Sequence, residues 1–231
     1  MIMNPLKNQI DQYQISEKSL DILNSTSVVM MVSITGGGKN TIIEELLKTN
    51  KFHYVVSHTT RQPRENNGQL EENGVNYWFL DDEQMLEKLT AGEFVEAKWV
   101  HDAYVYGTSI DELSKAQKSG KTPLLEIEVQ GVEEIMKAKP DAKAIFIVPP
   151  SFDTWMQRLN ARGKVSDDDQ ERRLKTAKLE LETALSVDHF HFLVNDELNK
   201  SVETAKKIIA TGEDDEIGRA VAEHLLLRLN D

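Results

Sequence analysis

The chain has 231 residues, of which 39% are hydrophobic, so it is long enough for one well-packed α/β domain with an appended subdomain. Its 27 Lys and Arg residues against 39 Asp and Glu residues give a net charge of −12, which argues against a protein that mainly binds nucleic acid or an anionic membrane. Cysteine is absent, which excludes disulfides, thiolate catalysis and cysteine-ligated metals. We therefore expect a soluble cytoplasmic protein.

The hydrophobic pattern predicts helices and strands that alternate along the chain. An N-terminal helical extension is expected over residues 6–23. After it the pattern predicts strand 28–32, helix 42–48, strands 54–57 and 123–127, helix 131–139, strand 144–148, helices 152–162 and 168–184, strand 190–194, and helices 199–210 and 215–229. Strands separated by helices favour a mainly parallel sheet.

Residues 61–108 differ from the rest, because they combine turn-rich sequences with short aromatic pieces. This composition predicts a small subdomain inserted at about 61–110. We expect a main domain at 27–211, an N-terminal helical extension at 1–26 and a C-terminal helical extension at 212–231.

A glycine-rich segment between the first strand and the next helix is typical of a nucleotide phosphate site. Backbone N–H groups of such a loop and the positive end of the helix bind phosphate, and Lys39 can reach the β and γ phosphates. The segment departs from the pattern G-x-x-x-x-G-K-[ST] at Ser33 and Asn40, and a glycine-rich turn without a ligand is the alternative. The residues expected around the phosphates are Thr35, Gly36, Gly37, Gly38, Lys39, Asn40 and Thr41.

A second polar motif, S-H-T-T-R-Q-P-R, occupies residues 57–64 just after a predicted strand. The planar, permanently charged guanidinium groups of Arg61 and Arg64 suit a phosphate monoester. The alternative is a polar loop whose arginines pair with nearby glutamates at positions 65, 71 and 72.

Together with E-E-N-G-V-N-Y-W-F at residues 71–79, these motifs resemble the guanylate kinase family over about residues 28–210. The resemblance implies an α/β fold of the P-loop NTPase type, in which helices flank a parallel sheet. It also implies that the insert is a GMP-binding subdomain and that a helical lid lies at about 160–172.

The resemblance also implies roles for residues on the acceptor side. The phosphate of GMP would be held by Arg61, Arg64, Tyr77 and Tyr106, and guanine would be read by Ser57, Glu96 and Thr108. A carboxylate accepts from guanine N1–H and from the exocyclic amine, which adenine does not offer on that edge. The segment Glu126-Ile127-Glu128-Val129-Gln130-Gly131 resembles the family's D-x-D-x-Q-G, which adds Glu128 to the GMP site and Glu126 to the metal.

On the donor side, the resemblance implies ATP with Mg²⁺. Lys39, Arg162 and Arg173 would be the catalytic cations, with Arg162 and Arg173 in the lid region, and Asn195 would lie beside the adenine. Mg²⁺ would be held mostly through ATP and water, with Thr41 and Glu126 as protein ligands.

The expected activity is transfer of the γ-phosphoryl group of ATP to GMP, giving ADP and GDP. No general base is required, because the phosphate of a nucleoside monophosphate is largely dianionic at neutral pH. Two alternatives remain: a guanylate-kinase-like binding module without turnover, and a kinase for another phosphorylated small molecule.

Overall fold

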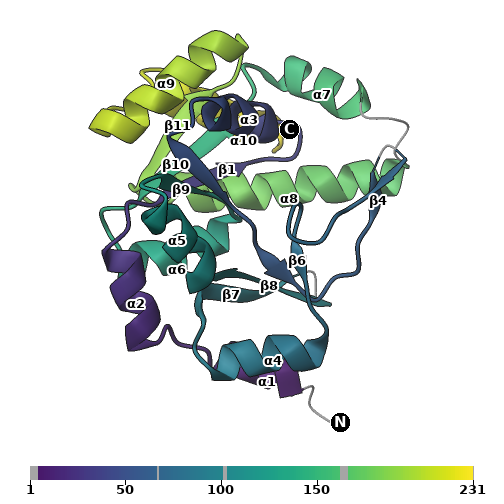
Figure 1. The fold of residues 1–231 in the computed structure, drawn as a ribbon. Coiled ribbons are helices and arrows are strands. Elements are labelled where there is room, and N and C mark those ends of the chain that lie inside the picture. Colours follow the sequence, from purple (N-terminus) through teal and green to yellow (C-terminus); the bar gives the residue numbers. More distant parts are fainter. Residues whose placement is uncertain (1–4, 67, 101–102, 162–165, 231) are drawn as a thin grey trace. The chain divides into compact units, whose positions relative to one another are not determined.

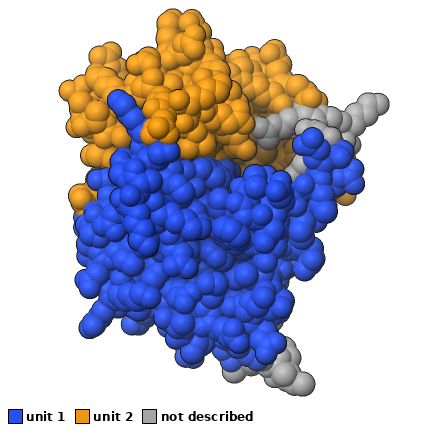
Figure 2. All heavy atoms as spheres, in the orientation of Figure 1, with its two compact units in different colours: residues 1–28, 51–126, 133–140 blue, residues 29–50, 127–132, 141–231 orange. Residues whose placement is uncertain are grey.

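The computed structural model describes residues 5–66, 68–100, 103–161 and 166–230. The chain divides into two units, which Figure 2 colours separately and which are described here one at a time. Unit 1 comprises residues 1–28, 51–126 and 133–140, and unit 2 comprises residues 29–50, 127–132 and 141–231. The fold is mixed α/β, with parallel strands and flanking helices, as the sequence predicts.

The strands of unit 1 are β2 (Phe52–Val55), β3 (His58–Thr59), β4 (Glu65–Asn66), β5 (Gln69–Leu70), β6 (Trp78–Phe79), β7 (Phe94–Val100), β8 (Tyr104–Ser109) and β9 (Thr122–Glu126). Four of them form a sheet in the order β6-β3-β8-β7, so β7 is an edge strand. β3 is parallel to β6 and antiparallel to β8, and β8 is antiparallel to β7. β2 and β9 pair parallel, and β4 and β5 form a short antiparallel pair.

Helices of unit 1 bury apolar side chains against this sheet. They are α1 (Pro5–Asp11), α2 (Glu17–Asn24), α4 (Asp82–Thr90) and α5 (Ile110–Lys118), and α1 lies beside α4 (Figure 1). Leu6 of α1, Met85 of α4 and Phe94 of β7 belong to one buried cluster. The residues of α6 (Val129–Ala138) are shared between the two units.

Unit 2 contains three parallel strands in the order β11-β10-β1. These are β1 (Val29–Ser33), β10 (Lys143–Val148) and β11 (Phe190–Val194), and nearly every residue in them is buried. The helices are α3 (Lys39–Lys48), α7 (Phe152–Ala161), α8 (Asp167–Leu185), α9 (Leu198–Thr211) and α10 (Gly218–Arg228). Because the strands are parallel and in register, the segments after β1, β10 and β11 all leave from the same edge, where α/β folds bind ligands.

The N-terminal extension differs from the single helical segment predicted at 6–23. It forms two helices, because Ser16 caps α2 by accepting a hydrogen bond from the backbone N–H of Ser19. The strand predicted at 54–57 lies at 52–55, and α3 begins at Lys39 rather than at residue 42. The sequence analysis did not identify α4 or α5.

None of the helices within the described ranges has the length and apolar character needed to span a membrane. The domain boundaries at 1–26, 27–211 and 212–231 stay a prediction.

Candidate active site

The predicted acceptor residues of unit 1 line up across the four-stranded sheet. The register pairs His58 with Trp78 on one side and with Gly107 on the other, and it pairs Thr108 with Glu96. Continuing this register by one residue sets Ser57 between Tyr77 and Thr108. Residues in such a row project from the same face of a sheet. The row Tyr77, Ser57, Thr108 and Glu96 therefore places a tyrosine, two hydroxyls and a carboxylate side by side.

Glu96 is the buried end of this row. Its side chain is only 6% exposed, and its carboxylate accepts a hydrogen bond of 2.7 Å from the hydroxyl of Thr108. Burial raises the pKa of Glu96 to about 7, although the hydrogen bond from Thr108 opposes the rise. The hydroxyl and the backbone N–H of Thr108 both donate to this carboxylate, which still has acceptor capacity for a ligand that brings its own N–H groups.

Arg61 lies at the opposite side of the predicted acceptor site. Its guanidinium donates from Nε to the hydroxyl of Tyr106 at 2.8 Å, and it lies over the ring of Tyr77, 5.1 Å from the centroid. The rings of Tyr77 and Tyr106 meet edge to face, with centroids 5.7 Å apart. Three of the four residues predicted to hold the acceptor phosphate are thus brought together.

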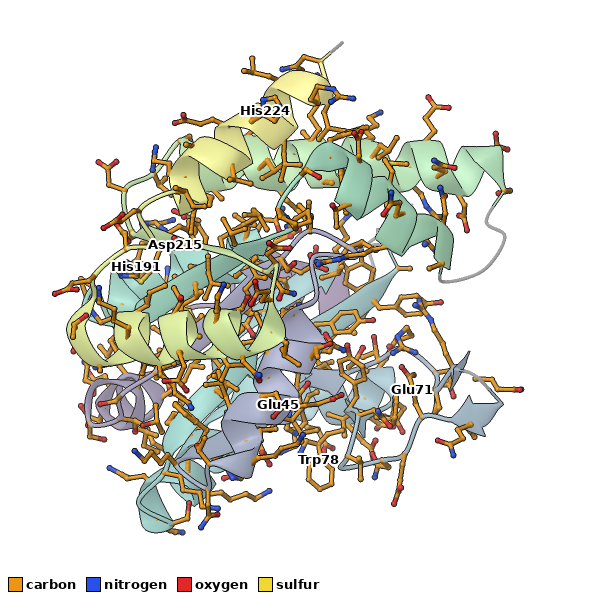
Figure 3. The ribbon with its side chains drawn as sticks, turned by 90° about the horizontal axis from the view of Figure 1, so that it is seen from above. Glu45, Glu71, Trp78, His191, Asp215 and His224 are labelled. Atoms are coloured by element: carbon orange, nitrogen blue, oxygen red, sulfur yellow. The ribbon has the colours of Figure 1, made fainter. Side chains whose placement is uncertain are left out.

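Glu71, which follows β5 (Figure 3), holds Arg61 in place. Two parallel hydrogen bonds of 2.8 and 3.1 Å join the guanidinium to its carboxylate. The pairing weighed from the sequence as an alternative therefore exists, and it orients Arg61. Glu71 also accepts from the backbone N–H of Arg64, whose side chain is exposed.

Tyr54 and Glu126 extend the acceptor cluster. The hydroxyl of Tyr54 donates to the carboxylate of Glu126 at 3.1 Å. Burial, with the charge of Glu126 adding to it, raises the pKa of Tyr77 to about 12. Tyr77 is therefore a neutral hydroxyl donor at physiological pH. Glu126, predicted as a metal ligand, interacts with tyrosines of unit 1.

The glycine-rich loop of unit 2 has the backbone of a phosphate-binding loop. Gly36 and Gly38 have φ values of +86° and +93°, which L side chains rarely adopt. A Cβ on Gly37 would lie 2.0 Å from Oγ of Ser33, so the serine that replaces the expected first glycine is accommodated by a glycine next to it. α3 begins at Lys39, and the N–H groups of a first helical turn have no partner within the helix.

Three side chains fasten this loop to the rest of unit 2. Asn195, which follows β11, donates its amide to the carbonyl of Gly37 at 2.9 Å. Trp155 of α7 donates its indole N–H to the carbonyl of Thr35 at 2.7 Å. Arg158, one turn further along α7, donates to the carbonyl of Asn195 at 2.9 Å. Side-chain donors therefore fix the carbonyls of Thr35 and Gly37, while the N–H of Gly37 donates within the loop to the carbonyl of Ile34 at 2.9 Å.

The charges of Lys39 and Glu128 both act on the carboxyl group of Glu180. Burial, together with the charge of Glu128, raises the pKa of Glu180 to about 7, while the charge of Lys39 lowers it. Glu128, predicted for the GMP site, thus lies close enough to Glu180 of α8 for its charge to act on that carboxyl. Thr41, the predicted metal ligand on α3, is exposed.

The lid residues are only partly described. Arg162 lies outside the described residues. Arg173 is half-buried on α8, and its neighbour Arg172 pairs with Asp169. Within the described ranges, no three His, Cys, Asp or Glu side chains are arranged to hold a metal ion.

The sequence profile of the family described as "Guanylate kinase" matches residues 25–212. The chain belongs to the guanylate kinase family. The match leaves α1, α2 and α10 outside the family region.

Known guanylate kinases resemble the chain over most of its length. It is 38% identical over 185 residues to "Guanylate kinase 1" of Oryza sativa subsp. japonica, covering 79% of this chain and 47% of that protein. It is 37% identical over 175 residues to the guanylate kinase of Hahella chejuensis, covering 75% and 81%. The chain thus spans about half of the plant relative and most of the bacterial one.

A crystal structure of guanylate kinase from Anaplasma phagocytophilum has a similar fold. The TM-score is 0.60 at 24% sequence identity, and the alignment covers 88% of this chain and 94% of that one.

Three residues near the two candidate sites were not predicted from the sequence. Arg158 lies next to the phosphate loop, and its Nη1 is buried without a hydrogen-bond partner among the described residues. A carboxylate oxygen of Glu180 is likewise buried without a hydrogen-bond partner among the described residues. The third residue is Tyr54, whose hydroxyl donates to Glu126. Arg158 is part of the R-L-x-x-R-G segment, and its place four residues before Arg162 in the helix predicted at 152–162 was the available signal.

Proposed function

We propose that this chain transfers the γ-phosphoryl group of ATP to GMP, giving ADP and GDP. The observation that carries the proposal is the row of Ser57, Thr108 and buried Glu96 in the same sheet as the Arg61–Tyr106 pair. One end of this sheet suits a guanine base, and the other suits a phosphate.

Guanine is selected by Glu96 and the neighbouring hydroxyls. The ionised carboxylate accepts from N1–H and from the exocyclic amine of guanine, while Ser57 and Thr108 donate to its acceptors. Adenine lacks this pair of donors on the same edge, so it would leave the buried carboxylate unpaired. The free-energy cost of leaving this buried charge without a donor makes the site select guanine over adenine.

The acceptor phosphate is held by Arg61, Arg64, Tyr77 and Tyr106. Arg61 is already oriented by Glu71, and Tyr77 is a neutral donor. At neutral pH this phosphate is largely dianionic and attacks without a general base. Its oxygen forms a bond to the γ phosphorus as the bond to the β–γ bridging oxygen breaks, and ADP leaves with the electron pair.

The donor is held by the phosphate loop of unit 2. Backbone N–H groups at the start of α3 and the ammonium of Lys39 bind the β and γ phosphates, and Arg173 and Arg162 neutralise the charge that spreads over the transferred group. Asn195 contributes by fixing the loop through the carbonyl of Gly37.

The residues of unit 2 fit a magnesium ion that arrives with ATP. Mg²⁺ prefers phosphate oxygens, water and few protein ligands, and the exposed hydroxyl of Thr41 in the first turn of α3 is the ligand proposed here. When bound, the ion would offset the negative charge of the donor phosphates. Glu126 is proposed as a second, water-mediated ligand.

Steady-state assays test the proposal. ADP release is measured in a coupled assay with ATP and Mg²⁺ and with GMP, AMP, UMP or a ribose phosphate as acceptor. We expect turnover with GMP far above the others. GMP binding without ADP release would support a binding module, and turnover with another phosphorylated acceptor would support the third interpretation.

A further inference from the structure

The N-terminal segment of residues 5–24 lies entirely outside the family match, yet it packs on the sheet that carries Glu96. α1 and α2 both contact β7, and α1 also contacts α4. Leu6 and Ile10 are buried in the cluster that contains Phe94. The extension is therefore an integral part of unit 1.

Tyr13, between the two helices, binds both backbone groups of Phe94. Its hydroxyl donates to the carbonyl of Phe94 at 2.7 Å and accepts from the N–H of the same residue at 3.1 Å. The hydroxyls of Ser16 and Ser19 donate to the carbonyl of Gly92 at 2.8 and 2.6 Å. On an edge strand these groups have no neighbouring strand to pair with, so the N-terminal segment takes that place.

Phe94 is the residue at which β7 becomes irregular. It pairs with Ser109 and Glu96 pairs with Thr108, so two steps along β7 match one step along β8. This is a β-bulge at Val95, and bulges redirect the side chains that follow them. The orientation of Glu96 therefore depends on how the strand is held immediately before it.

The ring of Phe94 links the same point to the centre of the sheet. A Cβ on Gly107 would lie 2.9 Å from the Phe94 ring, so the ring packs directly on β8 between Tyr106 and Thr108. The charge of Glu96 also acts on Tyr13: burial raises the pKa of Tyr13, and Glu96 adds to the rise. Tyr13 is thus bonded to the backbone of Phe94 and lies within the electrostatic influence of Glu96.

We propose that Tyr13 is a positioning residue for guanine recognition, which holds the bulge of β7 so that Glu96 lies in the row with Thr108. The inference rests on the proposed function. Removing the Tyr13 hydroxyl leaves both backbone groups of Phe94 without their partner and loosens the bulge. Recognition of the base then weakens, while donor binding in unit 2 does not change.

The test compares Tyr13→Phe with Tyr104→Phe. The first removes the hydroxyl and keeps the ring, and the second removes a hydroxyl at the opposite end of the same strand pair, where Tyr104 pairs with Val100. We expect Tyr13→Phe to raise the KM for GMP by about tenfold and to reduce the preference for GMP over AMP, a factor that corresponds to ~1.4 kcal/mol. The KM for ATP should stay the same in both variants.

Hydrogen exchange separates this inference from the proposed function. In Tyr13→Phe, amides in residues 94–99 should exchange faster than in the wild type, whether or not the protein turns over GMP. Absence of wild-type turnover would contradict the proposed function alone. Unchanged exchange over 94–99, an unchanged KM for GMP in an active protein, or an equal rise in both KM values would overturn the role of Tyr13.

Ser19→Ala provides a second variant if Tyr13→Phe does not fold. It removes one of the two hydroxyl donors to Gly92 and leaves Ser16 in place. We expect an increase of about threefold in the KM for GMP, in line with the loss of one hydrogen bond. No increase in the folded variant would overturn the proposal.

Discussion

Replacing Glu96 by glutamine removes a buried negative charge while keeping the size and the acceptor oxygen of the side chain. The hydroxyl of Thr108 can still donate to this oxygen. Since burial raises the pKa of Glu96 to about 7 from an ordinary value of 4.5, the ionised form is destabilised in the folded protein. The variant is therefore expected to be more stable and less selective.

The magnitude follows from the two pKa values. Between pH 4.5 and pH 7 the folded protein binds more protons at Glu96 than the unfolded chain does, so the stability of the wild type falls as pH rises through this window. At about 1.4 kcal/mol for each tenfold change in proton affinity, the charge costs ~3 kcal/mol at pH 8 and less than ~1 kcal/mol at pH 5. Glu96→Gln removes this cost and so gains stability, but burial of the new amide N–H groups offsets ~1 kcal/mol of the gain.

The assay is unfolding by urea and by heat at pH 5 and pH 8. Glu96→Gln should gain about 2 kcal/mol at pH 8, or about 4–8 °C in Tm for a chain of this length, and nothing at pH 5. Glu87→Gln on the exposed face of α4 is the matched control and should change neither value. At the same time kcat/KM for GMP should fall by about 100-fold, because the amide NH₂ meets a donor of guanine. Equal stability of wild type and Glu96→Gln at pH 8 would refute the reasoning.

Three further predictions concern pH, the donor site and the loop. The KM for GMP in the wild type should fall by about tenfold from pH 6 to pH 8 as Glu96 ionises around its raised pKa of about 7; initial rates over this range check it, and a Glu96→Gln profile that is equally steep would assign the effect to the phosphate of GMP instead. Lys39→Ala should lower kcat by at least about 10³ while GMP still binds by calorimetry, since the lysine acts on the donor phosphates; normal turnover would contradict that role. Gly37→Ala should raise the KM for ATP, because its Cβ would lie 2.0 Å from Oγ of Ser33, and adding Ser33→Gly should restore part of the loss; the absence of any effect would show that the loop tolerates this contact.

The sequence predicted the parallel strands of unit 2 well, because buried strands are continuous apolar runs. β11 lies at the predicted residues, and β10 begins one residue earlier than predicted. The N-terminal extension was predicted less well, since its helical spacing runs through Tyr13, which instead leaves the helix to bind Phe94, 81 residues away. A local pattern carries no information about such a contact.

The helix α4 was missed although its start has a local signal. Asp81 and Gln84 form a capping box, in which each side chain accepts from the backbone N–H of the other. α5 was missed as well, and it begins directly after β8 without a connecting turn.

The candidate site was predicted where motifs are local in sequence. Residues of the phosphate loop are consecutive in the sequence, so their short spacing sets their geometry. Arg61 and Tyr106 are 45 residues apart and meet because β3 pairs with β8, a contact that only the motif resemblance could suggest. Arg158 and Glu180 were not predicted, since their significance comes from burial beside the loop and from opposing charges that fold together from distant segments. The serine at position 33 is tolerated because Gly37, which has no side chain, lies against its hydroxyl, and the sequence does not show this contact.

Transfer of label from ATP tests the central claim most directly. The protein is incubated with Mg²⁺, GMP and ATP labelled in the γ phosphate, and the products are separated. The account predicts that the label leaves ATP and appears in the β phosphate of GDP, in a one-to-one ratio with ADP formed. Label that remains in ATP in the presence of GMP, or that appears as inorganic phosphate, would contradict it.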